Sequence, residues 1–322
     1  MTATYTRTAG STVGSYTISA TLSPAAVLAN YNITYNTAPF TITQGGLTIT
    51  ASNASRPYGV ANPVFTYTAA GLVSPDTVSS INLAPVCNTT ASPTSTVGNY
   101  PITCTGAVST ANYTVTYLPG TLMVTQASSA TSITSNSPNP SAIGAPVLVS
   151  FKVSGNGVPT GNVTVNASTG ESCVGSLTSG AGSCSITFAT TGARTLIATY
   201  PGDTNFLGSM SPSISQGSGD FTITATPASQ TIPSGHQGYF TLTVTPVSGL
   251  TGSVALSCSG APPNSTCTVS PSADNLQGAP ITSIVTLSAS QNVNHGTFTL
   301  TFTGKLAGGT LTRSTTVQLT VK

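Results

Sequence analysis

The sequence predicts an all-β protein made of several β-sandwich modules in tandem, and three observations support this prediction. The chain of 322 residues is 38% hydrophobic but only 4% charged, and it contains 32 Gly and 22 Pro. Many of the remaining residues are Thr, Ser and Asn, and Thr and Val favour strands because their branched side chains restrict χ1. Apolar and polar residues alternate along short segments, and an internal repeat divides the chain. This length suggests two or three domains.

The repeat predicts one complete module at residues 47–126 and part of another at 1–46. Three segments of the first copy return roughly 80 residues later, a period that corresponds to one domain per repeat. The matching segments are 11–18 with 95–102, 30–35 with 112–117, and 40–44 with 122–126. Residues 1–46 match only the second half of the complete module. This favours a chain that begins inside a longer protein; otherwise the partial module must pair its open edge elsewhere.

Two further modules are predicted at 127–216 and 217–322. In the first, Val147, Val149, Phe151 and Val153 share one face, the period of a half-buried strand. In the second, about seven such segments fall within about 100 residues, as in an immunoglobulin-like sandwich. Their apolar residues are Phe221, Ile223, Phe240, Leu242, Val244, Val254, Leu256, Cys258, Cys267, Val269, Val285, Leu287, Phe298, Leu300, Phe302, Val317, Leu319 and Val321. We therefore expect two packed sheets in each module.

The six cysteines form three close pairs, each inside a different module, as local disulfides would. The pairs are Cys87 with Cys104, Cys173 with Cys184, and Cys258 with Cys267. A turn-rich segment predicts that Cys173 and Cys184 face each other across a hairpin. The bridge between Cys258 and Cys267 is expected in or beside the core. Disulfides persist in oxidising compartments, so the pairs favour a location outside the cytoplasm.

The charge distribution argues against several classes of partner. Seven basic and five acidic residues give a net charge of +2 and form no basic patch, so we expect no nucleic-acid partner. No apolar stretch reaches the ~18 residues of a membrane span. The first residues, Met1 to Tyr5, have neither the charged n-region nor the apolar h-region of a signal peptide.

The titratable residues do not suggest catalysis or metal binding. Acid–base chemistry needs convergent groups, but the acids and histidines are thinly spread. They are Asp76, Glu171, Asp203, Asp220, Asp274, His236 and His295. Asp203 lies in a turn sequence in which Asp bonds its own backbone, and both histidines are expected in exposed turns. With no Cys-x-x-Cys pair and only two His, zinc is not expected, and calcium needs about six to eight oxygen ligands. We expect no catalytic, cofactor or metal site, and no enzyme.

Short motifs resemble known bacterial families. Residues 47–126 resemble the YGX-type MBG domain through the segments 56–59, 62–63, 97–100 and 112–117. Residues 127–216 resemble the bacterial Ig-like domain of group 3 through 159–163 and 198–206. Residues 217–322 resemble Ig-like modules repeated in large secreted bacterial proteins, through 220–223 and 249–254. The resemblance implies an extracellular multi-domain protein, often an adhesin or stalk, with no catalytic residues to transfer.

The expected function is a non-catalytic structural or adhesive spacer at the cell surface or outside the cell. Its modules are joined by short connections such as Gln216 to Gly219. Its partners are neighbouring modules of the same polypeptide, with a cell-surface glycan or protein as the expected external ligand. The alternative is a set of carbohydrate-binding accessory modules of a secreted hydrolase. Sugar platforms usually expose aromatic rings, and this chain has 11 Tyr but no Trp.

Overall fold

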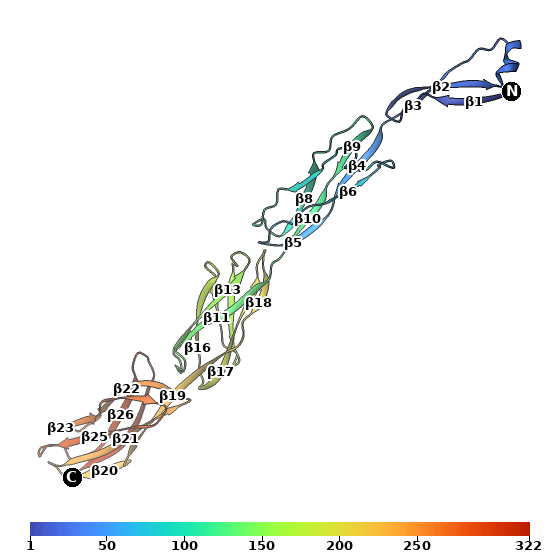
Figure 1. The fold of residues 1–322 in the computed structure, drawn as a ribbon. Helices are drawn as coiled ribbons and strands as arrows, with labels where there is room; N and C mark the ends of the chain where they lie inside the picture. Colours follow the sequence, from blue (N-terminus) through green and yellow to red (C-terminus); the bar gives the residue numbers. More distant parts are fainter. The chain divides into compact units, whose positions relative to one another are not determined.

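The computed structural model describes residues 1–322 and confirms the all-β prediction (Figure 1). The chain forms 27 strands and one short 3-10 helix. No helical segment has the length and hydropathy needed to cross a lipid bilayer. The chain divides into two compact units, Met1–Ala127 and Ser128–Lys322.

The first unit begins with a three-stranded antiparallel sheet. Its order is β1 (Thr2–Arg7), β2 (Gly14–Ser23) and β3 (Ala38–Ile42), with the 3-10 helix η1 (Ala25–Asn30) after β2. We call these strands the N-terminal sheet. Side chains along β2 alternate between half-buried and exposed, but no residue from 1 to 44 is fully buried. This sheet therefore has one apolar face and no core of its own.

Two facing sheets complete the first unit. One has the order β5 (Ala54–Pro57), β10 (Gly120–Thr125), β8 (Gly98–Thr105) and β7 (Val86–Thr89). The other has the order β6 (Tyr67–Ala70), β4 (Gly45–Ala51) and β9 (Tyr113–Leu118). Leu47, Ile49, Ile102 and Leu122 are fully buried between them because they occupy alternate positions on the inward faces. We call these two sheets the MBG sandwich, after the family that residues 47–126 resemble in sequence.

The sequence repeat has a structural counterpart, because β2 and β3 of the N-terminal sheet pair in the same register as β8 and β10 of the sandwich. Tyr16 lies opposite Phe40 in the N-terminal sheet, and Tyr100 lies opposite Leu122 at the matching place in the sandwich. Each tyrosine hydroxyl donates to the carbonyl four residues earlier, at 2.6 Å for Tyr16 and 2.8 Å for Tyr100. Residues 31–36, however, form no strand although their counterpart is β9. In the sandwich β9 pairs with β4, and the N-terminal sheet has no equivalent of β4.

The second unit contains two sandwiches that share one sheet. One outer sheet consists of β11 (Ser129–Ser137), β13 (Pro146–Gly155) and β16 (Ala181–Thr187). The other consists of β20 (Ser229–Ile232), β27 (Thr312–Val321), β26 (Gly296–Leu306), β22 (Thr251–Ser259) and β24 (Ala273–Gln277). The shared sheet has the path β15 (Ser172–Ser176), β14 (Asn162–Ala167), β17 (Gly192–Gly202), β19 (Ile214–Thr226), β21 (Gln237–Val247), β25 (Ile281–Ala289) and β23 (Ser265–Ser270). The short strands β12 (Ser141–Ala142) and β18 (Leu207–Met210) pair with β19 and β17.

Strand β19 belongs to both sandwiches (Figure 1). Residues 214–218 pair with β17 and residues 220–226 pair with β21. The expectation that Gln216 to Gly219 form a connecting linker is therefore wrong. The segment is polar, but residues 216–218 pair with β17, Ser218 and Gly219 pair with β12, and the Gly217 N–H bonds the Asn139 side chain. Sequence polarity alone does not reveal that pairing.

Most of the predicted strand faces are correct, and the exceptions are short or polar. Val147, Val149, Phe151 and Val153 are all buried on β13. In the last sandwich the alternation also holds, but β20 and β24 were not expected. Both are edge strands with few apolar residues, so they lack the alternating pattern on which the prediction depended.

Three disulfides form, in the pairs expected from the sequence. Cys87 and Cys104 are direct partners on neighbouring strands of one sheet. Cys258 on β22 and Cys267 on β23 join two different sheets beside the core. The three bridges contribute stability mainly by restricting the unfolded chain.

The hairpin predicted between Cys173 and Cys184 is wrong. These residues lie on β15 and β16, which belong to different sheets, so their disulfide ties the two layers together. Close packing of β15 against β16 explains how the disulfide can connect the two sheets. A Cβ on Gly175 would lie 2.2 Å from the Ser183 carbonyl oxygen, and one on Gly182 would lie 2.7 Å from the Phe151 ring. Only glycine allows the two layers to approach so closely at this edge.

Candidate functional site

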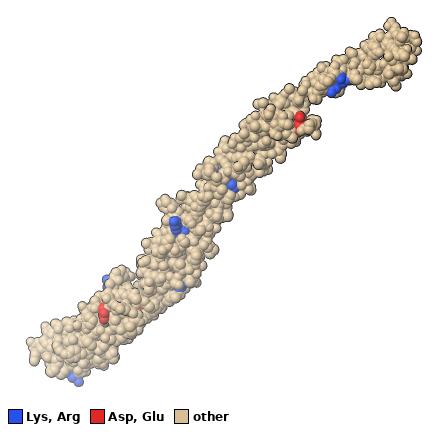
Figure 2. All heavy atoms as spheres, in the orientation of Figure 1, with Lys and Arg blue, Asp and Glu red and all other residues tan.

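The charged side chains lie as isolated spots on the visible surface (Figure 2). Each acidic residue accepts a hydrogen bond from a neighbouring group. The principal partners are Tyr113 for Asp76, Thr169 for Glu171, Thr160 for Asp203, Arg313 for Asp220 and the Asn275 N–H for Asp274. No group of three or more His, Cys, Asp or Glu residues is placed to hold a metal ion. Each acid is thus held by its own neighbouring groups, and these contacts bring no two acids together.

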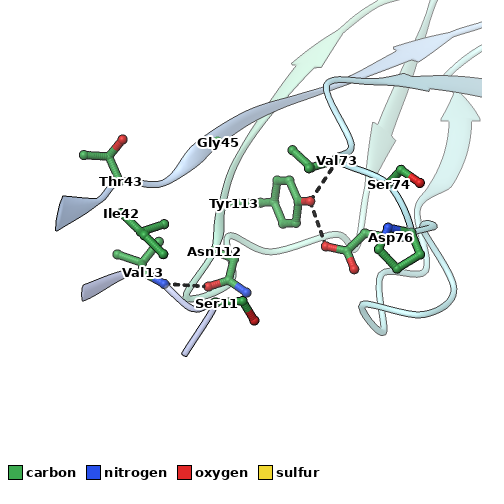
Figure 3. A pocket seen from close by; sticks show the side chains of 11 residues that line it. Ser11, Val13, Ile42, Thr43, Gly45, Val73, Ser74, Asp76, Asn112 and Tyr113 are labelled. Atoms are coloured by element: carbon green, nitrogen blue, oxygen red, sulfur yellow. Dashed lines mark hydrogen bonds between the residues drawn. The ribbon is translucent and has the colours of Figure 1, made fainter. Parts of the chain in front are cut away.

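A polar cleft in the first unit lies between the N-terminal sheet and the MBG sandwich (Figure 3). This junction pocket has a volume of about 340 Å³. Its lining residues are Ser11, Val13, Ile42, Thr43, Gly45, Val73, Ser74, Pro75, Asp76, Asn112 and Tyr113. The Asn112 side-chain oxygen accepts the Val13 N–H at 3.0 Å, so the start of β9 holds the preceding sheet.

Tyr113 fixes the inner wall of the junction pocket. Its hydroxyl donates to the Asp76 carboxylate at 2.8 Å and accepts the Val73 N–H at 3.1 Å (Figure 3). The Val73 hydrogen bond lowers the Tyr113 pKa, but the hydrogen bond to Asp76, burial and the carboxylate charge together raise that pKa above its ordinary value. The tyrosine ring is only 3% exposed, so it cannot serve as a stacking platform for a sugar.

Gln44 closes the connection between the N-terminal sheet and β4. Its amide nitrogen donates to the carbonyls of Thr110 and Ala111 at 3.0 and 3.2 Å. Its amide oxygen accepts the Thr114 hydroxyl at 3.0 Å. The pocket has a carboxylate, an amide and hydroxyls, but no nucleophile beside a base. Its residues act as a joint between consecutive modules.

The residues that resemble the YGX motif organise one end of the MBG sandwich. Arg56 is buried, and its guanidinium donates to the Asn62 side chain at 2.6 Å, to the Pro57 carbonyl at 3.1 Å and to the Ser92 carbonyl. Gly59 has φ +78° and donates its N–H to the Pro93 carbonyl at 3.0 Å. The buried charge is thus satisfied by neutral acceptors, as burial of a cation requires. The motif has a structural role that sequence reasoning did not assign.

The two segments that resemble the group 3 domain meet at Asp203. One carboxylate oxygen accepts the N–H groups of Asn205 and Phe206 at 2.8 and 2.9 Å, which confirms the predicted turn bond to its own backbone. The other accepts the N–H and the hydroxyl of Thr160, both at 2.9 Å. Burial raises the Asp203 pKa, but these hydrogen bonds outweigh it and leave the pKa below its ordinary value. Burial and the nearby Asp203 carboxylate raise the pKa of Tyr200 to about 12.

The structure brings both histidines to one serine, which the sequence did not suggest. His295 Nε2 lies 2.9 Å from the Ser234 hydroxyl, and His236 Nδ1 lies 3.1 Å from the Ser234 carbonyl oxygen. A serine–histidine pair is one part of a hydrolytic triad, but here no carboxylate side chain orients either imidazole. The group is exposed to solvent. Its hydrogen bonds hold the turn at 233–236 against the adjoining loop.

Comparison with known proteins gives two family matches. Residues 47–123 match the family described as MBG domain (YGX type), and residues 133–217 match the one described as bacterial Ig-like domain (group 3). No curated protein matches the chain.

Several solved structures match the chain at low identity. A C-terminal domain of the AgI/II polypeptide BspA of Streptococcus agalactiae has 8% identity and a TM-score of 0.36, over 60% of this chain and 99% of that one. Invasin, described as a bacterial integrin-binding protein, has 14% identity and a TM-score of 0.32, over 100% of this chain and 60% of that one. The D0–D1 domains of intimin have 15% identity and a TM-score of 0.24, over 58% of this chain and 98% of that one.

Proposed function

Since the chain carries an MBG domain of the YGX type and a group 3 bacterial Ig-like domain, we propose that it is a non-catalytic spacer segment of a bacterial extracellular protein. The proposed modules are those expected from the sequence, at 1–46, 47–126, 127–216 and 217–322. They would carry an adhesive or other functional domain at a distance from the cell. The three disulfides support a location outside the cytoplasm.

The observation that supports this function most directly is the sharing of β19 by two sandwiches. Gln216, buried in that strand, donates to the Pro138 carbonyl at 3.1 Å and accepts from Asn136 at 2.8 Å. A flexible linker would have a solvated backbone, whereas this strand is paired or capped through the junction. Continuous pairing resists bending of one sandwich against the other.

The two sandwiches also share apolar contacts and an ion pair. Ala142 of β12 is buried within the hydrophobic core of the C-terminal sandwich, and Ile143 and Ala145 pack against it. Asp220, at the junction, binds Arg313 of β27 at 2.5 Å. The Arg313 side chain is 40% exposed, so solvent limits the contribution of this ion pair to stability. The apolar contacts of Ala142, Ile143 and Ala145 therefore couple the two sandwiches more strongly.

Spin-label distances within the second unit test this function. Labels introduced through non-natural amino acids at Leu148 and Ile284 leave the six cysteines bonded, and both positions are exposed. A narrow distance distribution is expected in the intact chain. Four glycines inserted after Gly217 provide the matched control and should broaden it. An equally broad distribution without the insertion would contradict the spacer proposal.

Carbohydrate binding is the second candidate, and exposed tyrosine is the observation in its favour. Tyr239 on β21 is half exposed, and its hydroxyl donates to the Gln237 side chain. A single ring offers weaker stacking than the aromatic platforms of sugar-binding proteins. Binding on a glycan array that is lost in Tyr239→Ala would establish this function, and an array without binding would remove it.

A further inference from the structure

The N-terminal sheet is half of a fold that the same chain completes elsewhere. We propose that this sheet binds a polypeptide segment of the type of residues 45–76, which would supply the missing strands and complete a second MBG sandwich. The occupant is defined by sequence pattern: a strand with alternating apolar residues like Leu47, Ile49 and Ala51, followed by two shorter strands.

The strand pairing shows which positions are open. In the MBG sandwich, β10 pairs with β8 on one edge and in parallel with β5 on the other. In the N-terminal sheet, β3 pairs with β2 on the matching edge and has no partner on the second. Residues 31–36 likewise lack the parallel partner that β4 gives to β9. An open strand edge and an extended segment are the elements that β-augmentation uses.

Side-chain burial also shows that the apolar face of the N-terminal sheet lacks covering strands. Leu122 is 0% exposed in the sandwich, whereas its counterpart Phe40 is 41% exposed. Tyr113 is 3% exposed, whereas its counterpart Tyr31 is 64% exposed. Because both copies keep the same residue alternation and cross-strand register, the difference arises from the covering strands and not from the sheet itself.

Polar contacts distinguish this occupant from a general hydrophobic partner. In the sandwich, the hydroxyl of Tyr113 is held by Val73 and Asp76, which follow directly after β6. The equivalent Tyr31 is exposed, so its hydroxyl is accessible to the counterparts of the Val73 N–H and the Asp76 carboxylate. Arg7 is the only charged side chain in residues 1–44, and its guanidinium carbon lies 4.9 Å from the Tyr16 ring centroid and 5.2 Å from that of Phe40. The open face is therefore the repeat equivalent of a face that the sandwich covers with its own strands, and it presents apolar and hydroxyl groups at the matching positions.

Hydrogen exchange on the full chain tests the proposal. A synthetic peptide of residues 45–76, which includes Val73 and Asp76, is added, and amide exchange of residues 28–43 is followed by mass spectrometry. Exchange at β3 should slow at least about tenfold, as expected when an exposed edge becomes hydrogen-bonded. The matched peptide with Leu47→Asp and Ile49→Asp should give no protection. In the chain, Phe40→Asp should abolish the effect, while Thr41→Asp on the exposed side should retain it.

A second variant removes the dependence on peptide affinity. A copy of residues 45–85 fused before Met1 places the three strands at the spacing they have in the sandwich, and residues 28–43 should then be protected without peptide. Exchange at 113–118 reports whether the peptide instead displaces β4. The proposal is overturned if neither peptide nor fusion protects residues 28–43, or if the peptide protects only 113–118. It is also overturned if the chain alone dimerises with β3 protected, since a second copy would then be the occupant. None of these outcomes alters the stiffness measured between Leu148 and Ile284.

Discussion

Adding one methyl group at Gly219 should destabilise both sandwiches of the second unit. A Cβ built on Gly219 would lie 2.7 Å from the Leu250 Cβ, 2.8 Å from the Val247 carbonyl oxygen and 3.0 Å from the Leu250 N. Two of these atoms belong to the backbone and cannot move aside without shifting the strand. Overpacking of this kind costs about 1–3 kcal/mol. For a unit of this size, a cost of about 2 kcal/mol lowers the Tm by roughly 4–8 °C.

Calorimetry and hydrogen exchange on Gly219→Ala measure this effect. Because β19 is paired with β17 and β21, protection should fall on both strands, one in each sandwich. Gly309→Ala is the matched control, since its new Cβ would meet only the Leu311 N at 3.9 Å. That control should change the Tm by less than about 2 °C. Loss of protection at β21 with β17 unchanged would refute the coupling of the sandwiches through β19.

Three further predictions concern the first unit, a disulfide and pH. Arg56→Lys should lower the free energy of unfolding of the first unit, measured in urea, by about 1–3 kcal/mol, because a single ammonium nitrogen cannot reach the three acceptors that Nε, Nη1 and Nη2 bond separately. An unchanged urea midpoint would contradict this. Replacing Cys258 and Cys267 together by Ser should cost roughly 2.5–3 kcal/mol by the loop-closure relation, and full stability in reducing agent would argue against it. The lowered Asp203 pKa means that the folded state binds fewer protons than the unfolded state, so its stabilisation is complete above about pH 5 and is lost as pH falls through the lowered value. Thr160→Val should weaken that acid dependence in a pH series of melting curves, and an identical series would contradict it.

The sequence predicts faces of strands better than it predicts their neighbours. Alternation identified the buried side of β13 because burial of one face enforces a period of two. It could not show that β19 continues through Gln216 to Gly219, because that segment is stabilised by pairing with strands far away in sequence. Gly217 and Gly219 are the sequence feature that could have indicated a packed strand, since both pack closely against other residues. Glycine is equally typical of a linker, so the two residues did not decide between a strand and a linker.

The candidate sites show the same limit. The bond of Asp203 to its own turn is local and was predicted, whereas its second partner, Thr160, lies on a different loop. Likewise, Ser234 and His295 come together only through the fold of the last sandwich. The open face of the N-terminal sheet was suggested by the incomplete repeat, but its exposed Tyr31 and Phe40 required the structure.

Residue-level hydrogen exchange across residues 214–226 tests most directly whether the second unit is one continuous structure. The account predicts slow exchange along the whole of β19, with residues 217–220 protected to a degree comparable with the strand on either side. Fast exchange confined to 217–220, with protected strands before and after, would show a flexible linker and contradict the account.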